Sequence, residues 1–338
     1  MSTSLPVHQT PLNITQALWV ANSTDVLEFL PSQLGNGESD PTPHLTNKSV
    51  SFGSPEGVTF DANGNLWVVD VGSTGPPAIA PALYEFSAQQ LTALGSNQRP
   101  IPVVTIRSSV FSFPQQAVFD SKGDLWVSDD GSNSVFEFTP TQLAASNNNV
   151  TPNFTIASNP SFSGPLGIAF SPKGNLFIAN NASTTIYEFN AGTLPTTRGT
   201  FTLQPNVVLT DNGNNTIQGP WALAFDAAGN LWSSNSAGLN TIVKFSASQL
   251  QTTGTPAAAI TISPTTDAGD MTLATPNGLA FDSEGDLSAV SSFSPFGIEL
   301  YAHGQLGTTN AIVPQVFLLG PNSTLSAPAG DVFGPIVN

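Results

Sequence analysis

Carboxylate and amide side chains recur at two fixed positions along this chain, and they are the residues whose chemistry the sequence can suggest. The first position lies directly before a short apolar run and is filled in chain order by Glu56, Gln115, Leu166, Trp221, Asn277 and Ala329. The second position ends a following apolar run and is filled by Asn22, Asp70, Asp129, Asn180, Asn235 and Ser291. Carboxylate and amide oxygen atoms are the ligands that a hard cation such as calcium prefers. The two sets therefore predict an oxygen-rich site for a cation or for a polar ligand.

Other kinds of catalytic chemistry find few residues here. The chain has no cysteine and three histidines, His8, His44 and His303, none of which falls at either recurring position. A nucleophile activated by histidine is therefore not predicted, and we expect no organic cofactor. If the protein is an enzyme, we expect it to work through a metal ion and carboxylates, with Asp70 or Asp129 as the general base.

Alternatives remain open for several of these residues. An Asp or Asn after a strand commonly bonds the backbone of its own loop, so the second set serves either as loop anchors or as site residues. In the site interpretation, Asn22, Asn180 and Asn235 bind a ligand together with Gln115. Trp221 either stacks on a flat ligand such as a sugar or fills the centre of the molecule as packing.

A repeated sequence pattern must position these residues. The clearest copies read GVTFDANGNLWVVD (57–70), QAVFDSKGDLWVSD (116–129), GIAFSPKGNLFIAN (167–180), ALAFDAAGNLWSSN (222–235) and GLAFDSEGDLSAVS (278–291). Each copy reads as a strand, a turn containing Asp and Gly, and a return strand rich in aromatic and β-branched residues. A repeat of 50 to 60 residues made of short strands indicates a radial or solenoid architecture.

Two further strands complete each unit. In the unit that begins at Glu56, the third strand is 82–86 and the fourth is 103–106. Between them, Ser87 and Gln90 have the spacing of a helix capping box. Four antiparallel strands per repeat are typical of a propeller blade, and we expect the acids of the third strands to be structural. These are Glu28, Glu85, Glu137, Glu188 and Glu299, with Lys244 as the exception.

The two ends of the chain hold half-units that complement each other. The return strand 17–22 has no first strand before it, and the first strand 328–333 has no return strand after it. We therefore expect the C-terminal strand to join the N-terminal blade and close the ring, which removes free sheet edges. The predicted fold class is all-β, a six-bladed β-propeller in a single domain, 17–338, with an N-terminal tail, 1–16.

These residues resemble NHL-repeat propellers and, more distantly, the gluconolactonase (senescence-marker) family, both of which are six-bladed. In the gluconolactonase family a Glu-Gly at the start of a first strand and an Asn-Gly in a later blade supply metal ligands. Glu56-Gly57 and Asn277-Gly278 match these two motifs, whereas Leu166 and Trp221 stand where a further acidic ligand is expected. The resemblance implies a metal, for which we expect calcium, bound by Glu56 and Asn277 with Asp70 nearby.

Composition limits the partners. With 7 Lys and Arg against 23 Asp and Glu, the formal charge of −16 would repel nucleic acid. No apolar run is long enough for a membrane-spanning helix. The low charge and abundant Asn and Thr favour a secreted or periplasmic protein whose signal peptide is absent from this sequence, and we expect a monomer.

Two functions are therefore predicted from the sequence. The first is an exported propeller that binds a small molecule, a glycan or a protein partner on one face. The second is a metal-dependent hydrolase of lactones or related esters that uses Glu56 and Asn277 as metal ligands.

Overall fold

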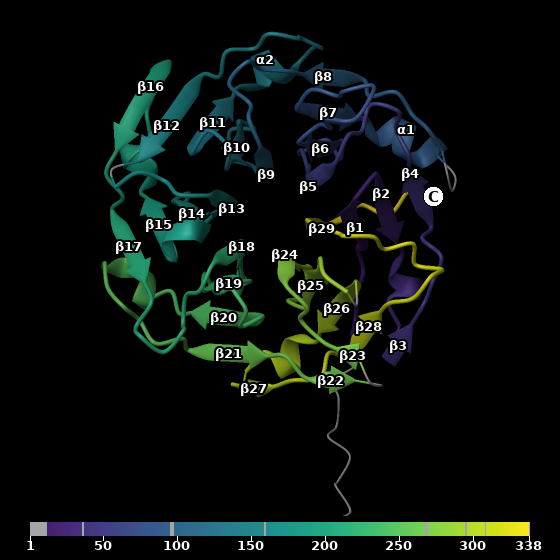
Figure 1. Ribbon diagram of the computed structural model, residues 1–338, viewed down its shortest axis with the longest axis vertical. Coiled ribbons are helices and arrows are strands. Elements are labelled where there is room, and N and C mark those ends of the chain that lie inside the picture. The colour runs from purple at the N-terminus through teal and green to yellow at the C-terminus, as the bar shows by residue number, and fades with distance from the viewer. Residues whose placement is uncertain are drawn as a thin grey trace, which may run out of the picture.

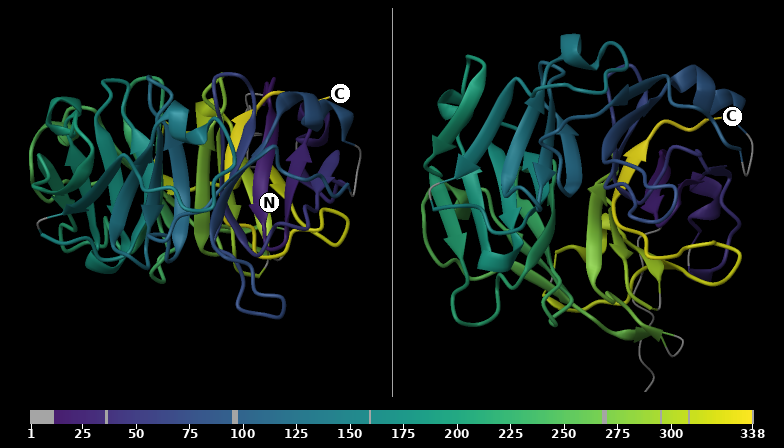
Figure 2. Two further views of the ribbon diagram at one scale, coloured as in Figure 1. Left: turned by 90° about the horizontal axis from the view of Figure 1, so that it is seen from above. Right: turned by 45° about the horizontal axis from the view of Figure 1, so that its top comes forward.

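Six antiparallel sheets stand side by side around a central axis as the blades of a propeller (Figure 1). The computed structural model describes residues 12–35, 37–94, 98–158, 160–267, 270–294, 296–307 and 309–337. Seen from the edge, the blades form a flat disc (Figure 2). Each blade holds four antiparallel strands, so the predicted six-bladed β-propeller is confirmed. Residues 1–11 of the predicted N-terminal tail lie outside the described residues.

The strands of each blade follow one another from the axis outward. Blade 1 contains β29 (Asp331–Gly334), β1 (Ala17–Asn22), β2 (Asp25–Phe29) and β4 (Leu45–Asn47), and blade 2 contains β5 (Pro55–Phe60), β6 (Leu66–Asp70), β7 (Ala82–Phe86) and β8 (Val104–Ile106). Blade 3 contains β9 (Pro114–Phe119), β10 (Leu125–Asp129), β11 (Ser134–Phe138) and β12 (Phe154–Ser158), and blade 4 contains β13 (Pro165–Phe170), β14 (Leu176–Asn180), β15 (Thr185–Phe189) and β17 (Val207–Thr210). Blade 5 contains β18 (Pro220–Phe225), β19 (Leu231–Asn235), β20 (Thr241–Phe245) and β21 (Ile260–Ser263), and blade 6 contains β24 (Pro276–Phe281), β25 (Leu287–Ser291), β26 (Gly297–Tyr301) and β28 (Val316–Leu318).

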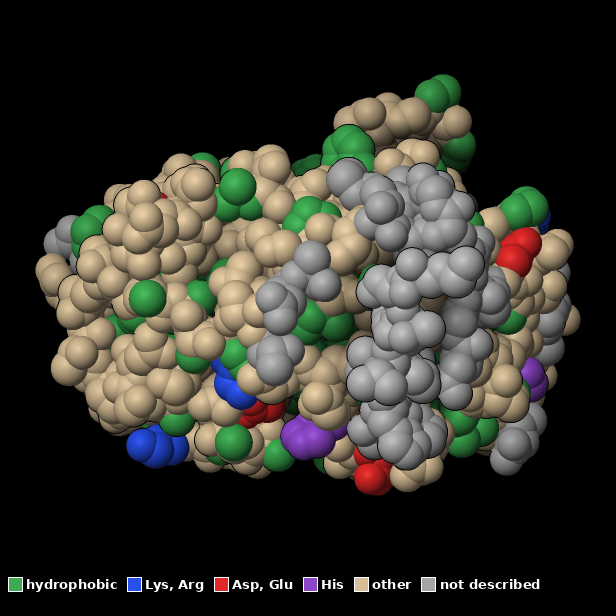
Figure 3. All heavy atoms as spheres, turned by 90° about the horizontal axis from the view of Figure 1, so that it is seen from below, with side chains coloured by type: hydrophobic (Ala, Val, Ile, Leu, Met, Phe, Trp, Pro, Cys, Tyr) green, Lys and Arg blue, Asp and Glu red, His purple; other side chains and the backbone are tan. Residues whose placement is uncertain are grey.

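The remaining elements are short. They are the rim strands β3 (Gly37–Ser39), β16 (Gly199–Leu203) and β27 (Asn310–Ala311), the hairpin β22 (Thr266–Asp267) and β23 (Asp270–Met271), the helices α1 (Ala88–Ala93) and α2 (Pro140–Leu143), and the 3-10 turns η1 (Pro31–Gln33), η2 (Asn181–Ser183), η3 (Ala191–Thr193), η4 (Gln249–Gln251) and η5 (His303–Gln305). No helix in the described ranges is both long and apolar enough to cross a membrane. Figure 3 shows the disc edge-on, and charged side chains are few on this part of the rim, in keeping with the 9% of charged residues in the sequence.

The blades have two distinct ends. We call the end at which the first strands begin and the second strands finish the top face, and the opposite end the bottom face. On the bottom face, Asp61 joins the first two strands of blade 2 by accepting hydrogen bonds from the N–H groups of Asn63 and Asn65, each at 2.9 Å. Gly64 supplies the positive φ of +76° that this turn needs. The predicted capping box is also present, with Ser87 and Gln90 bonded to each other's backbone at the start of α1.

Aromatic rings join neighbouring blades near the bottom face. The second strand of a blade places Trp or Phe against the Phe that ends the first strand of the next blade, with centroid separations of 5.1–6.1 Å and steep interplanar angles. The pairs are Trp19–Phe60, Trp67–Phe119, Trp126–Phe170, Phe177–Phe225 and Trp232–Phe281. At the sixth junction Ser288 takes the place of the aromatic residue and donates a hydrogen bond to the carboxyl group of Asp331. Edge-to-face packing of this kind adds to the burial of apolar area between blades.

Parallel pairing links the blades again at the outer rim. The segment between the third and fourth strands of each blade pairs in parallel with the outer strand of the preceding blade at all six junctions. The pairs are Asn47 with Gln98, Ile106 with Asn147, β12 with β16, Leu209 with Gly254, β21 with β27, and β28 with β3. The sequence did not predict these contacts, because the connecting segments lack a strand-like pattern.

The C-terminal strand closes the ring as predicted. β29 pairs with β1 from Ala17 opposite Gly334 to Val20 opposite Asp331. Two backbone hydrogen bonds extend the pairing toward the top face, from Ala21 to Gly330 at 2.8 Å and from Ala329 to Ala21 at 2.9 Å.

One residue of the predicted third-strand acids is misplaced. In blades 1 to 5, the third-strand residues that pair with the aromatic residue of the second strand are Glu28, Glu85, Glu137, Glu188 and Lys244. In blade 6 the corresponding pair is Ser288 with Leu300. Glu299 instead aligns with Tyr84 of blade 2, on the other face of the sheet. Because side chains alternate along a strand, an error of one residue in the register moves the carboxylate to the opposite side.

Candidate functional site

The six residues of the first recurring position meet in one pocket on the top face; five are the second residue of a first strand, and Ala329 lies just before β29. The volume of the pocket is about 630 Å³, and its wall includes Glu56, Gln115, Leu166, Trp221, Asn277 and Ala329. The structure thus brings together four of the sequence-predicted site residues: Glu56, Gln115, Trp221 and Asn277. Their roles in binding stay predictions.

A break in the strand register accompanies these residues. In blade 2, Pro55 pairs with Asp70 and Gly57 with Val69, so the register shifts around Glu56. The same kind of shift occurs at the start of the first strands of blades 3 to 6. Such a bulge re-aims a side chain that would otherwise alternate with its neighbours, and it accounts for side chains that face the axis.

The glycines that follow pocket residues have a packing role. A Cβ atom on Gly57 would stand 2.7 Å from the carbonyl oxygen of Gln115 in the next blade, and one on Gly330 would stand 2.7 Å from that of Glu56. On Gly167 it would overlap the carbonyl oxygen of Trp221. The glycine of the Glu-Gly motif is therefore explained by the close approach of adjacent first strands.

Among the six residues of the first recurring position, the polar side chains and the large apolar side chains lie on different blades. Going round the ring through blades 6, 1, 2 and 3, Asn277, Ala329, Glu56 and Gln115 follow one another, whereas blades 4 and 5 present Leu166 and Trp221. Three phenylalanines from top-face loops add to the lining, namely Phe113, Phe293 and Phe296. The exposed fractions of Phe113 and Phe293 are 44% and 65%, which is high for large apolar side chains.

Negative charge predominates in this pocket. Glu56 and Asp130 are the charged residues among its described lining, and none carries a positive charge. The pKa of Glu56 is raised to about 7, mainly by burial; the hydrogen bond from the Ser54 hydroxyl lowers it, and the Asp70 carboxylate adds to the rise. That hydroxyl donates to Glu56 Oε1 at 3.3 Å. Glu56 is therefore able to donate or accept a proton near neutral pH.

Asn277 has an unused hydrogen-bond acceptor. Its side chain is only 5% exposed, and its Oδ1 atom is buried without a hydrogen-bond partner among the described residues. A buried amide oxygen in this state costs free energy unless a bound molecule satisfies it. The described residues thus leave one acceptor of the pocket wall without a donor.

The second predicted set has a different role, because its two acids bind backbone. Asp70 accepts hydrogen bonds from the N–H groups of Gly53 at 2.9 Å, Ser54 at 3.3 Å and Gly72 at 2.7 Å. Asp129 accepts from Ser112 at 2.9 Å, Phe113 at 3.1 Å and Ser132 at 2.8 Å. Each carboxylate thereby joins the loop before the first strand to the loop after the second strand.

The asparagines of this set do the same. Asn180 accepts from Ser163 N–H at 2.6 Å, Asn235 from Gln218 N–H at 2.9 Å and Asn22 from Ser326 N–H at 2.7 Å. None of Asn22, Asp70, Asp129, Asn180 and Asn235 is among the described residues that line the pocket. Of the two alternatives for this set, the contacts match loop anchors.

The sequence reasoning did not identify the phenylalanines at the mouth. Phe113 directly precedes the proline that opens a first strand, and Phe293 and Phe296 lie in the loop after β25. The signal in the sequence that could have identified them is the presence of large apolar residues in the variable top loops. They were indistinguishable from loop packing until their exposure was known.

The pocket offers few ligands to a cation. Its side-chain oxygen donors of the preferred kind are the carboxylates of Glu56 and Asp130 and the amide oxygens of Gln115, Asn181 and Asn277. Within the described ranges, no group of three or more His, Asp and Glu side chains is placed to hold a metal ion. Calcium takes roughly six to eight oxygen ligands, so these residues fit it only if other molecules supply the remaining ones.

Comparison with known proteins supports the fold. No protein-family model matches the sequence, and no curated protein matches it. Among solved structures, a chain of a nidogen–laminin complex has a TM-score of 0.59 at 12% identity, with 94% of this chain and 98% of that chain covered. The periplasmic gluconolactonase of Pseudomonas aeruginosa has a TM-score of 0.53 at 17% identity, with 96% and 99% covered. A protein of unknown function from Bacteroides caccae has a TM-score of 0.56 at 10% identity, with 96% and 98% covered. The chain is therefore similar in fold to six-bladed propeller proteins.

Proposed function

We propose that this protein binds a small, uncharged molecule with a flat or ring-shaped face, such as a saccharide unit, in the top-face pocket. The observation that carries this proposal is the meeting of six equivalent positions, one from each blade, in a single pocket of about 630 Å³. That volume lies in the range of pockets that hold small molecules.

The chemistry of the wall supports a neutral ring. Trp221 offers an apolar face for stacking, while Glu56, Gln115 and Asn277 offer acceptors and donors on the opposite part of the wall. A sugar ring has an apolar face and a rim of hydroxyl groups, which matches this division. An anionic ligand is disfavoured because Glu56 and Asp130 would repel it.

Tryptophan fluorescence provides a direct test. Of the five tryptophans, Trp19, Trp67, Trp126 and Trp232 are buried between blades, and Trp221 lines the pocket. Titration with a panel of neutral mono- and disaccharides should change the emission for at least one of them. Trp221→Ala should remove that change and weaken binding by roughly tenfold or more, since stacking contributes on the order of 1 kcal/mol beyond burial.

Trp126→Phe is the matched control, because it alters a buried tryptophan away from the pocket and should leave binding unchanged. If no neutral ligand binds in calorimetry, or if Trp221→Ala binds as well as the native protein, the proposal is wrong.

A second candidate, a metal-dependent hydrolase of lactones or esters, is favoured by one observation. Glu56, whose pKa is raised to about 7, lies in the same pocket as the unpartnered Oδ1 of Asn277. Here Glu56 and Asn277 would hold calcium, which polarises a carbonyl group when bound. Because Glu56 would be bound to calcium in this candidate, the general base would be Asp70 or Asp129.

The melting temperature with calcium and with chelator separates the two candidates. A site in the native state raises stability as it fills. A rise with calcium that Glu56→Gln abolishes, together with hydrolysis of simple lactones, would favour the hydrolase over the binding protein.

A further inference from the structure

The C-terminal segment of this protein shows how a groove between two blades holds an extended peptide. Beyond β29, residues 335–337 lie along the junction of blades 1 and 2 on the bottom face. The indole Nε1 of Trp19 donates to the carbonyl oxygen of Pro335 at 3.2 Å, and the N–H of Val337 donates to Glu28 Oε1 at 3.1 Å. The Val337 side chain is 3% exposed.

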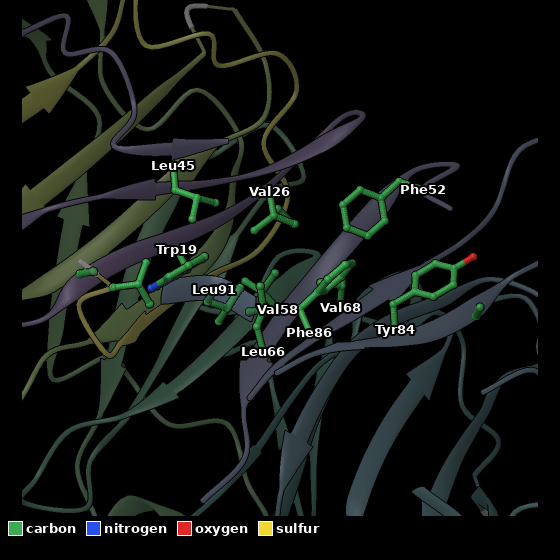
Figure 4. Packing of buried hydrophobic residues seen from close by; sticks show 14 residues of the cluster. Trp19, Val26, Leu45, Phe52, Val58, Leu66, Val68, Tyr84, Phe86 and Leu91 are labelled. Atoms are coloured by element: carbon green, nitrogen blue, oxygen red, sulfur yellow. The ribbon is translucent and has the colours of Figure 1, made fainter. Parts of the chain in front are cut away.

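Apolar contacts complete this groove. Val337 packs in one cluster with Trp19, Leu66 and Leu91, three side chains that Figure 4 shows turned toward one another. Thus Trp19, Glu28 and Leu91 contribute to holding a segment that has the sequence Pro-Ile-Val, and His44 Nε2 lies within hydrogen-bond distance of the Val337 carbonyl oxygen, at 3.1 Å.

The junction of blades 2 and 3 repeats the tryptophan, glutamate, phenylalanine and leucine of this groove, and no segment from the described residues occupies it. Val103 stands in the place of His44. By strand register, Trp67 corresponds to Trp19, Glu85 to Glu28, and Phe119 to Phe60. Leu143 follows the capping-box Gln142 as Leu91 follows Gln90. All four of Trp67, Glu85, Phe119 and Leu143 line a groove of about 500 Å³.

The donor at the centre of this groove is unsatisfied. Trp67 is 3% exposed, and its Nε1 is buried without a hydrogen-bond partner among the described residues. The corresponding atom of Trp19 bonds the peptide carbonyl of Pro335. A buried N–H without a partner destabilises the protein. A peptide carbonyl in the equivalent place would bond Trp67 Nε1 and remove this unfavourable free energy.

The other junctions differ in ways that single out this one. Residues 12–16 cover the junction of blades 6 and 1, where Leu12 and Ile14 pack on the core and Gln16 accepts from Ser283 N–H at 2.9 Å. Trp126 and Trp232 already donate to Asp120 and Asp226, at 3.4 and 3.1 Å.

The remaining two differences concern the chemistry of the groove. Phe177, between blades 4 and 5, has no donor, and Lys244, between blades 5 and 6, replaces the glutamate. In the described parts of the chain, only the groove between blades 2 and 3 combines a free indole N–H with the acceptor and remains open.

We propose that this groove binds an extended segment of a partner protein in which a proline is followed two residues later by valine or another aliphatic residue. Trp67 would donate to the carbonyl of the proline, Glu85 would accept the N–H of the aliphatic residue, and Phe119 and Leu143 would contact its side chain. This site lies on the face opposite the top pocket and does not depend on the function proposed for that pocket.

The probe is an acetylated and amidated peptide that copies residues 333–337, Phe-Gly-Pro-Ile-Val, with a photoreactive leucine in place of Ile. Binding to the full chain should saturate at one peptide per protein, and irradiation should attach the peptide within residues 61–67 or 119–144. Trp67→Phe and Glu85→Leu should each weaken binding by roughly three- to tenfold, the value of one hydrogen bond.

Matched controls test the assignment to this groove. Trp126→Phe and Glu188→Leu make the same changes in other grooves and should leave the affinity unchanged, as should replacement of Trp221. Absence of saturable binding at millimolar peptide, or attachment confined to the neighbourhood of Trp19 and Leu91, would overturn the proposal. Self-association in sedimentation that Trp67→Phe abolishes would assign the groove to a second copy of the chain and would equally overturn it.

Discussion

The hydroxyl of Ser291 donates a hydrogen bond to Glu299 Oε1 at 3.1 Å, and through this pair blade 6 replaces the anchor that the other blades carry on the second strand. Ser291 occupies the position of Asp70 in blade 2, and Glu299 that of Tyr84. The shorter serine leaves room for the glutamate, which also accepts from Leu273 N–H at 2.6 Å and Tyr301 Oη at 2.9 Å. The anchoring oxygen atoms thus come from the neighbouring strand.

A double-mutant cycle should reveal this exchange. Glu299→Tyr alone removes the acceptor of three donors and should lower the free energy of unfolding by about 3 kcal/mol. Ser291→Asp alone places a second carboxylate beside Glu299 and should also destabilise. The two changes together restore the arrangement of blade 2, so the double variant should be more stable than the sum of the single effects predicts. Urea denaturation provides the measurement, and strictly additive effects would contradict the exchange.

Stability should fall as the pH rises from about 5 to about 8. Burial raises the pKa to about 7 for five carboxyl groups, namely Glu28, Glu56, Glu137, Glu299 and Asp331. Between the ordinary carboxyl pKa and about pH 7, these groups are protonated in the folded state and ionised in the unfolded state. Their contribution to the free energy of unfolding is therefore full below the ordinary carboxyl pKa and is lost as the pH rises past about 7. We expect the melting temperature to be higher at pH 5 than at pH 8 by on the order of 5 °C.

Glu299→Gln serves as the control for this pH effect. Glutamine cannot titrate but keeps an oxygen acceptor for Ser291 and Leu273, so the variant should show a shallower slope between pH 5 and 8. A melting temperature that rises with pH over this range would contradict the raised pKa values.

Close packing at the axis should make Gly167 intolerant of a side chain. A Cβ atom there would overlap the carbonyl oxygen of Trp221, whereas a Cβ atom on Gly192 would meet no atom within 4 Å. Gly167→Ala should therefore cost roughly 2 kcal/mol or more and displace Trp221. Gly192→Ala should be close to neutral. Thermal unfolding and ligand titration of both variants test this, and equal stabilities would exclude the steric explanation.

Removal of the closing strand should be far more damaging than a small truncation. Deleting residues 326–338 removes β29 and leaves the inner edge of β1 without its partner. We expect loss of the cooperative thermal transition. Deleting residues 335–338 should be milder, because it keeps β29 and removes the Val337 contacts. If the two truncated proteins had the same melting temperature, the pairing of β29 with β1 would contribute little to stability.

The sequence predicted the parts of this protein that repeat. The shared position of Glu56, Gln115, Trp221 and Asn277 could be predicted from the proline before each. The closure of the ring by the C-terminal strand could be predicted from the two half-units. The exchange between Ser291 and Glu299 could not, because it depends on which face of β26 each residue occupies. Nor could the state of Trp67 Nε1, since its sequence context matches that of Trp126, whose indole is bonded to Asp120. Such differences arise from the distances between side chains rather than from their order.

Because of the parallel pairing at the rim, each blade contributes a segment to the outer edge of the preceding blade. To separate two blades radially, the molecule must break both the aromatic contact near the bottom face and the hydrogen bonds at the outer strands. The two sets of contacts lie at different distances from the propeller axis. A rotation of one blade that pulls the contacts at one distance apart therefore presses those at the other distance together. The ring should therefore resist mechanical opening as a single body and rupture in one event when pulled, instead of releasing its blades one at a time.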